Sequence, residues 1–336
     1  MKALILAAGL AATPLLASQA LAQSDCGGID RPVVFAGLDW DSNSFQNGVA
    51  GFILEHGYGC EVDEIPGSTI PLLNGMIRGD IDITMEMWIP NVREAWDKAE
   101  ADGDIAAVGV SYPDAKQAWY VPKYMVEGDD AVAPDLKSVE QLGSYKQLFE
   151  DPEEPEKGRF LNCVIGWQCE IVNSKKLIAY GLDEDYSNIR PGAGAALEAA
   201  VEAAYLRERP VLFYHWVPTW LIGKYDFVML EEPAYDKAVW DAMMAEERPT
   251  EATAYPQTKV VIGANTEFTE KSEEITEFFM QYSTTSAETS AALAYMHDND
   301  AEADEAALEF LRTKPDVWTK WVPADVAERV SAAVAK

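Results

Sequence analysis

Between residues 33 and 79, apolar residues recur first at the spacing of a strand and then at the spacing of a helix, and this order occurs twice. Residues 33–38 (VVFAGL) form a short apolar run typical of a buried strand, and residues 43–56 then place apolar side chains at helical spacing. The same order returns with residues 60–65 as a strand and residues 68–79 as a helix. The chain therefore starts with strands and helices in alternation.

Residues 81–88 (IDITMEMW) show the strict alternation of a strand. One face would carry four apolar side chains, and the other would carry Asp82, Thr84, Glu86 and Trp88. Further along, a strand is predicted over 210–214 and helices over 194–207, 271–280, 288–296 and 303–313. Strands separated by helices indicate an α/β fold with parallel sheets.

Residues 1–22 have the pattern of a secretory signal peptide. Lys2 precedes an apolar stretch, and residues 20–22 (ALA) fit an A-x-A cleavage site. The alternative is a transmembrane anchor, because about 20 apolar residues can span a bilayer, but Thr13 and Pro14 interrupt the run. We therefore expect export into the periplasm and a mature chain that starts after this site.

The charge of the chain limits its partners. Removing 22 of the 336 residues leaves 314, enough for two domains, and takes the formal net charge from −31 to −32 because Lys2 is lost. A protein this negative is repelled by nucleic acid and by anionic membrane surfaces. Neither is expected as a partner.

Four cysteines in an exported chain indicate disulfides, and four cysteines allow three connectivities. Cys163 and Cys169 are six residues apart and are expected to close a small loop, which leaves Cys26 to pair with Cys60. A metal site is the competing interpretation, but Cys26 and Cys60 have no cysteine close to them in sequence.

The sequence offers no recognisable catalytic centre. It has three His, none at metal-ligand spacing, and it lacks the G-x-S-x-G, P-loop and G-x-G-x-x-G motifs. No nucleophile stands beside an evident base. A binding protein is therefore expected rather than an enzyme, with a secreted enzyme and a sensory ligand-binding protein as the alternatives.

Tryptophan is the residue type that stands out. Four of the ten Trp follow predicted strands or lie between the two close cysteines: Trp40, Trp88, Trp167 and Trp216. Ligands of α/β proteins bind beyond the carboxyl ends of strands, and Trp rings bind cations through their faces. Core packing explains any one of these Trp equally well, but four in such positions favour a site between two lobes. Trp119 is a further candidate, and the Trp on predicted helices are expected to pack in the core: Trp96, Trp240, Trp318 and Trp321.

Three segments around these residues resemble the aromatic motifs of glycine betaine- and choline-binding proteins of ABC importers: MEMWIPN, CVIGWQCE and FYHWVPTW. The resemblance covers residues from about 30 to 320. It implies a type II-like periplasmic-binding-protein fold, with two α/β lobes joined by two hinge strands and the ligand in the cleft between the lobes. Trp88, Trp167 and Trp216 match the cage of the betaine binders, and Trp40 matches an aromatic residue of choline binders.

The family also implies limits for the two lobes and a set of partners. Lobe 1 is expected over 23–118 and 229–336, and lobe 2 over 119–228. The partners would be a small methylated amine and the transmembrane permease of an importer with its cytoplasmic ATPase. The chain is expected to act as a monomer.

One position departs from the betaine binders. Those proteins place a His four residues after the Trp of the first motif, to hold the ligand's carboxylate, and here that residue is Val92. Glu86 is expected on the same side of its strand as Trp88, where its charge would oppose a carboxylate. The sequence most resembles the trimethylamine N-oxide-binding members of the family. That ligand therefore ranks first, glycine betaine or dimethylsulfoniopropionate second, and choline third.

The loop at residues 150–156 holds five acids and is interrupted by Pro152 and Pro155. It lacks the D-x-D-x-D-G order of a calcium loop, so a solvated connection is expected, with bound calcium as the alternative. Because the loop leads into the Trp167 segment, Glu153 is a second candidate for a carboxyl group at the ligand. No other cofactor is predicted.

Overall fold

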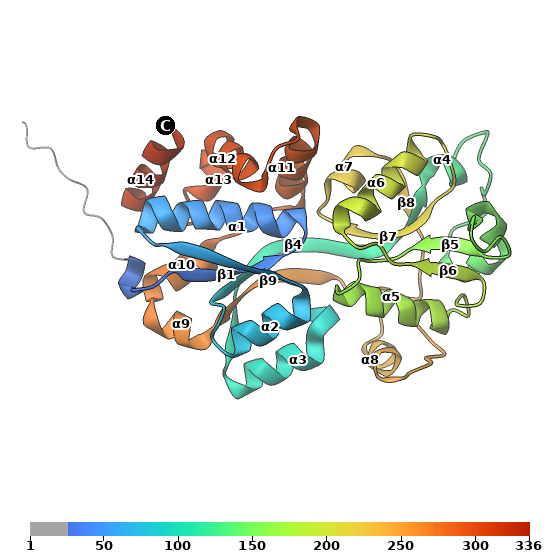
Figure 1. Cartoon of the computed structure of the whole chain (residues 1–336), viewed down its shortest axis with the longest axis horizontal. Coiled ribbons are helices and arrows are strands. Elements are labelled where there is room, and N and C mark those ends of the chain that lie inside the picture. The colour runs from blue at the N-terminus through green and yellow to red at the C-terminus, as the bar shows by residue number, and fades with distance from the viewer. Residues whose placement is uncertain (1–25) are drawn as a thin grey trace, which may run out of the picture.

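The computed structural model describes residues 26–336, so the predicted signal peptide at 1–22 lies outside the described residues. The described chain folds into two lobes, which lie side by side in Figure 1. Each lobe has a central sheet with helices on both of its faces. The predicted two-lobed α/β fold is confirmed.

The described residues form two mixed sheets from the following strands: β1 (Val33–Leu38), β2 (Val62–Gly67), β3 (Ile83–Met87), β4 (Ile105–Pro122), β5 (Gly158–Leu161), β6 (Tyr186–Ile189), β7 (Leu212–Val217), β8 (Phe227–Met229) and β9 (Thr258–Asn265). The helices that cover them are α1 (Asp41–Ile53), α2 (Thr69–Ile77), α3 (Ile89–Asp102), α4 (Lys123–Val126), α5 (Gln168–Ala179), α6 (Gly194–Tyr205), α7 (Trp220–Lys224), α8 (Lys237–Ala245), α9 (Thr266–Lys271), α10 (Glu273–Gln281), α11 (Ser286–Asn299), α12 (Ala303–Thr313), α13 (Pro315–Trp318) and α14 (Ala324–Val334).

The strand order differs between the lobes. The first lobe has the order β2-β1-β3-β9-β4, and the second has the order β4-β7-β5-β6, with β8 paired to β4. β1 pairs in parallel with β2 and β3, and β5 pairs in parallel with β6 and β7. In Figure 1, α1 lies above the first sheet and α2 and α3 lie below it. Because helices cover both faces, every residue of β3 is buried, including the face predicted to be polar.

Strand β4 belongs to both lobes. Its residues from Ile105 to Ala115 pair with β9 of the first lobe, and those from Lys116 to Tyr120 pair with β7 of the second. β9 runs antiparallel to β4 and carries the chain back into the first lobe. These are the two crossing strands that the family resemblance implied, and a ligand between the lobes would lie against β4.

The second lobe extends further along the chain than its predicted limit at residue 228. α8 packs against α5 of the second lobe. Just before α8, Glu232 forms an ion pair with Lys176 of α5, with 2.6 Å between Oε1 and Nζ and both side chains buried. Because these contacts hold residues 230–257 to the second lobe, the chain returns to the first lobe only at β9.

Neither a membrane span nor a metal cluster is found in residues 26–336. None of the helices there is both long and apolar enough to cross a bilayer. No three His, Cys, Asp or Glu side chains of these residues are arranged to hold a metal ion. Two acids of the loop considered for calcium form ion pairs instead, Asp151 with Arg159 at 2.9 Å and Glu154 with Lys157 at 2.8 Å.

The buried ion pair of the second lobe yields a stability prediction. Replacing Glu232 by Ala leaves the Lys176 ammonium buried without its partner, which should cost about 3–5 kcal/mol of the free energy of unfolding. Replacing Lys98 by Ala, which removes an exposed pair with Asp102, should leave the free energy of unfolding nearly unchanged. Urea unfolding of both variants measures the difference. Equal losses would contradict the role given to the buried pair.

Candidate ligand-binding site

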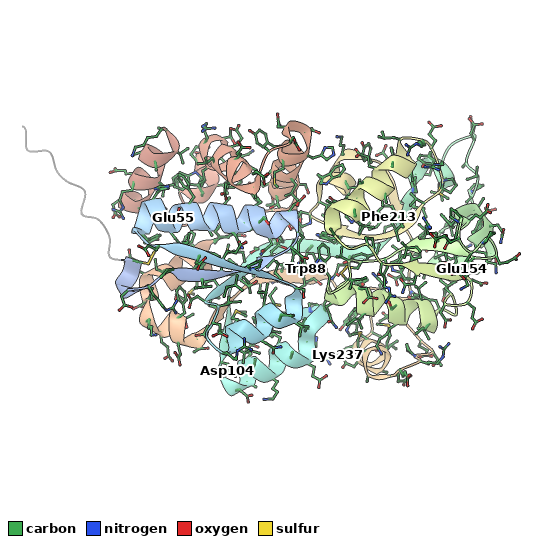
Figure 2. The ribbon with its side chains drawn as sticks, viewed as in Figure 1. Glu55, Trp88, Asp104, Glu154, Phe213 and Lys237 are labelled. Carbon is green, nitrogen blue, oxygen red and sulfur yellow. A yellow bond between two sulfur atoms is a disulfide. The ribbon has the colours of Figure 1, made fainter. Side chains whose placement is uncertain are left out.

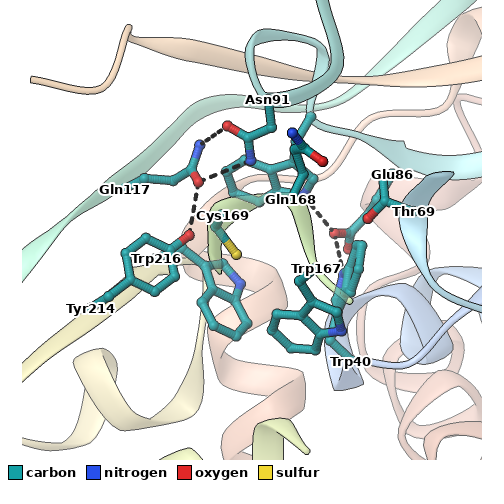
Figure 3. A pocket seen from close by; sticks show the side chains of 11 residues that line it. Trp40, Thr69, Glu86, Asn91, Gln117, Trp167, Gln168, Cys169, Tyr214 and Trp216 are labelled. Carbon is teal, nitrogen blue, oxygen red and sulfur yellow. Dashed lines mark hydrogen bonds between the residues drawn. The ribbon is translucent and has the colours of Figure 1, made fainter. Parts of the chain in front are cut away.

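A pocket lies between the lobes. The residues that line it come from both lobes: Trp40, Thr69, Glu86, Trp88, Asn91, Gln117, Trp167, Gln168, Cys169, Tyr214 and Trp216 (Figure 3). The structure therefore brings all four predicted cage tryptophans into one cavity.

Three of these tryptophans stand where a helix begins. Trp40 follows β1 and is the N-cap residue of α1, and Trp88 follows β3 and is the N-cap residue of α3. Trp167 is the N-cap residue of α5, whereas Trp216 lies within β7. The turn from a strand into a helix occurs at the carboxyl end of the strand, which is where α/β proteins place their ligands.

The rings of three cage residues are in contact. Trp167 lies edge-to-face with Trp40, with ring centroids 5.1 Å apart, and edge-to-face with Trp216 at 5.3 Å. The interplanar angles are 73° and 76°, the geometry that aromatic pairs favour. Trp40 belongs to the first lobe and the other two to the second, so this aromatic wall crosses the cleft.

Glu86 links the fourth cage ring, that of Trp88, to Trp40 of the aromatic wall. Its Oε2 accepts hydrogen bonds from Nε1 of Trp40 at 2.8 Å and from Nε1 of Trp88 at 3.3 Å, and its Oε1 accepts one from the Tyr112 hydroxyl at 2.5 Å. The side chain is buried, and burial raises the pKa of this carboxyl above its usual value, although the three donors act in the opposite direction. Glu86 thus fixes two indoles and presents a carboxyl group to the cavity.

A second polar group lines the cavity, and sequence reasoning did not find it. Oε1 of Gln117 accepts hydrogen bonds from the Tyr214 hydroxyl at 2.8 Å and from Nδ2 of Asn91 at 3.2 Å (Figure 3). Nε2 of Gln117 donates to Oδ1 of Asn91 at 3.4 Å. Asn91 and Tyr214 lie within the motifs MEMWIPN and FYHWVPTW, so the sequence offered a signal for these two residues. Gln117 lies on β4, which carried no motif.

The loop before α5 positions Trp167. Cys163 and Cys169 form a disulfide across it, and Cys26 and Cys60 form the other, so both predicted pairings are confirmed. Gly166 has φ 92°, a left-handed conformation that favours glycine.

Space for the Trp167 ring depends on a second glycine. A Cβ atom at Gly194 would lie 3.2 Å from Cη2 of that ring. Because this is a tight approach, the absence of a side chain at Gly194 lets the first turn of α6 lie against the indole.

Three residues that the sequence singled out lie outside the cavity. Trp119 is fully buried in the second lobe, where its ring lies 4.4 Å from Phe160 and its Nε1 donates to Asn173 at 2.8 Å. Val92 is buried in the core of the first lobe and does not line the cavity. The position that the betaine binders use for a His therefore faces the protein interior here.

Glu153 is also remote from the site. It is exposed in the acidic loop, and Figure 2 shows its neighbour Glu154 at the far end of the second lobe from Trp88. The backbone N–H of Glu153 donates to Oδ1 of Asp151 at 3.1 Å, a local contact within the loop. The carboxyl group in the cavity is that of Glu86.

A family comparison now identifies the chain. Residues 31–313 match the family described as the substrate binding domain of ABC-type glycine betaine transport systems. The chain belongs to this family. The chain is therefore a substrate-binding protein of the ABC-type glycine betaine transport family.

Individual relatives agree with this assignment. The glycine betaine-binding periplasmic protein OusX of Dickeya dadantii (strain 3937) is 26% identical over 258 residues, which covers 73% of this chain and 72% of the relative. Among solved structures, the glycine betaine and L-proline-binding protein ProX of Borrelia burgdorferi has a TM-score of 0.71 at 17% identity and covers 89% of this chain and 100% of its own.

An ABC-transporter choline-binding protein, solved in complex with choline, also has a TM-score of 0.71, at 16% identity, and covers 92% of this chain and 98% of its own. At these identities, both likenesses to solved structures concern the fold.

The four cage tryptophans should contribute to affinity separately and measurably. Each Trp→Ala substitution should weaken ligand binding by about 1–3 kcal/mol, roughly ten- to a hundredfold, because one desolvated ring face is lost. Trp→Phe should retain part of the affinity. Titration calorimetry of the four variants measures this.

Matched controls for the cage variants are Trp240→Ala and Trp321→Ala, since both rings are buried away from the cavity. They should lower stability and leave affinity unchanged. Wild-type affinity in two or more of the four cage variants would show that the cage is wrongly assigned.

Removing the Cys163–Cys169 disulfide should affect binding more than folding. The loop that it closes spans a sequence separation of only six, so it constrains the unfolded chain little. The double Ser variant should lose affinity because the Trp167 loop is freed. Calorimetry and thermal unfolding compare the two effects, and a lower melting temperature with unchanged affinity would contradict the prediction.

Proposed function

We propose that the chain captures trimethylamine N-oxide in the periplasm and delivers it to the transmembrane permease of an ABC importer. The observation that carries the ligand is the composition of the cavity, which combines four Trp rings, one buried carboxyl group and three side-chain amides. None of the described residues that line it is Lys, Arg or His. Export would use the predicted signal peptide at 1–22.

The methylated ammonium head suits the aromatic side of the cavity. A desolvated cation over a Trp face is stabilised by about 2 kcal/mol or more. Glu86, with its Oε2 among the indole nitrogens of Trp40 and Trp88, adds a negative charge when it is ionised. A cationic centre with three methyl groups would therefore be held by ring faces and by one countercharge.

The polar end of the ligand should be an acceptor. Oε1 of Gln117 already accepts two hydrogen bonds, so the Asn91–Gln117 pair offers mainly its remaining amide N–H groups. An N-oxide oxygen only accepts hydrogen bonds and fits such donors. When it is protonated, the carboxyl group of Glu86 can also donate a hydrogen bond to that oxygen.

The competing ligands fit less well. The carboxylate of glycine betaine would be buried near Glu86 without a cationic side chain beside it, which is unfavourable. The hydroxyl of choline is a hydrogen-bond donor, whereas the Asn91–Gln117 pair offers mainly amide N–H donors to the polar end of a ligand. Glycine betaine remains the second candidate, because the Dickeya relative is named for it.

A ligand panel tests this ranking. In titration calorimetry, trimethylamine N-oxide should bind most tightly, followed by glycine betaine and dimethylsulfoniopropionate, and then choline. Glu86→Gln should weaken trimethylamine N-oxide binding by about tenfold, the equivalent of 1.4 kcal/mol, and should affect glycine betaine less. Glu94→Gln, an exposed site on α3, is the control and should change neither affinity. Tighter binding of glycine betaine by the wild type would overturn the choice of ligand.

A further inference from the structure

Asp39 makes a hydrogen bond that crosses the cleft. It lies in the turn between β1 and α1 of the first lobe, and its Oδ1 accepts a hydrogen bond of 2.5 Å from Nε1 of Trp167 in the second lobe. No Lys, Arg or His of residues 26–336 forms an ion pair with Asp39. The side-chain group that pairs with the Asp39 carboxyl group is therefore the indole N–H of Trp167.

The bond follows a pattern within the cage. The indole N–H groups of Trp40 and Trp88 donate to Glu86, and that of Trp167 donates to Asp39. Hydrogen bonds to an ionised carboxylate are stronger than those between neutral groups. A carboxyl group therefore restricts the orientation of three of the four cage rings.

Trp167 is the ring for which such a limit matters most. Its indole is in contact with Trp40 on one side and Trp216 on the other, so a change in its orientation would disrupt the whole wall. Gly194 leaves space for the ring but holds it by no polar contact. Within the described residues, the bond to Asp39 is the hydrogen bond that fixes its nitrogen edge.

We propose that Asp39 is a positioning residue that holds Trp167 against the ligand through a hydrogen bond made when the two lobes are closed. This role of Asp39 rests on the proposed function only in that a methylated amine must occupy the cage, whichever amine it is. Because the partners belong to different lobes, the bond is lost when the cleft opens. Asp39 therefore ties the completion of the cage to closure.

Kinetics distinguish this role from simple attraction of a cation. A bond that forms after the ligand has entered slows release, so its loss should raise the dissociation rate and leave the association rate unchanged. An exposed carboxylate that attracts ligand from a distance would instead change the association rate, and salt would screen the effect.

Stopped-flow tryptophan fluorescence with trimethylamine N-oxide, glycine betaine and choline measures both rates. Asp39→Ala should raise the dissociation rate by roughly tenfold, as expected for a hydrogen bond to a charged group. Asp39→Asn keeps an oxygen acceptor and should recover part of the loss. Asp97→Ala, which removes an exposed acid of α3, should behave as wild type.

A double-mutant cycle assigns the effect to the bond itself. Trp167→Phe keeps a ring but has no N–H donor, so Asp39→Ala should add little in that background. The same tenfold loss in the Phe background, or a loss confined to the association rate, would overturn the proposal.

A spectroscopic test does not depend on the identity of the ligand. The indole N–H signal of Trp167, assigned by its absence in Trp167→Phe, should move in Asp39→Ala and stay in place in Asp97→Ala. The spectra are recorded without ligand and with each of the three amines. A signal that Asp39→Ala leaves unchanged in every state overturns the proposal. If trimethylamine N-oxide does not bind the wild type, the proposed function fails, and the spectra with glycine betaine or choline still decide the role of Asp39.

Discussion

The aromatic wall of this protein exists only where the two lobes meet. Trp40 comes from the first lobe, Trp167 and Trp216 come from the second, and the rings touch at centroid distances of 5.1 and 5.3 Å. Separating the lobes would break these contacts and expose ring faces to water. Under the proposed function, a methylated cation would complete this interface, so ligand binding would favour closure of the two lobes. Strands β4 and β9 pair with each other where the chain crosses between the lobes.

Under the proposed function, the polar groups around the cage determine which ligand is bound. A buried carboxyl group is costly unless donors or a cation compensate it, and Glu86 has three donors and faces a cavity without a cationic side chain. A ligand that brings its own positive charge relieves that cost. The amides of Asn91 and Gln117 lie in the same cavity and suit an oxygen acceptor. The carboxyl group of Glu86 and the amide donors of Asn91 and Gln117 thus both favour a ligand that combines a positive charge with an oxygen acceptor.

Much of the fold follows from local periodicity, and much of the site does not. β1 and α12 have the predicted bounds because their apolar residues keep a regular spacing. β4 was missed because its pairing with β9 is interrupted by register shifts and its sequence has no steady alternation. The tryptophans could be found from their places after strands. Gln117 and Asp39 could not, since their neighbours are set by contacts between distant segments.

The central claim is that the cage recognises positive charge and not merely a three-methyl shape. Calorimetry with tert-butanol, a neutral molecule that matches trimethylamine N-oxide in size and shape, tests this most directly. The account predicts that the neutral molecule binds at least about thirtyfold more weakly, since about 2 kcal/mol of cation–π attraction is absent. Comparable affinity of the two molecules would contradict it, because the rings would then act only as an apolar surface.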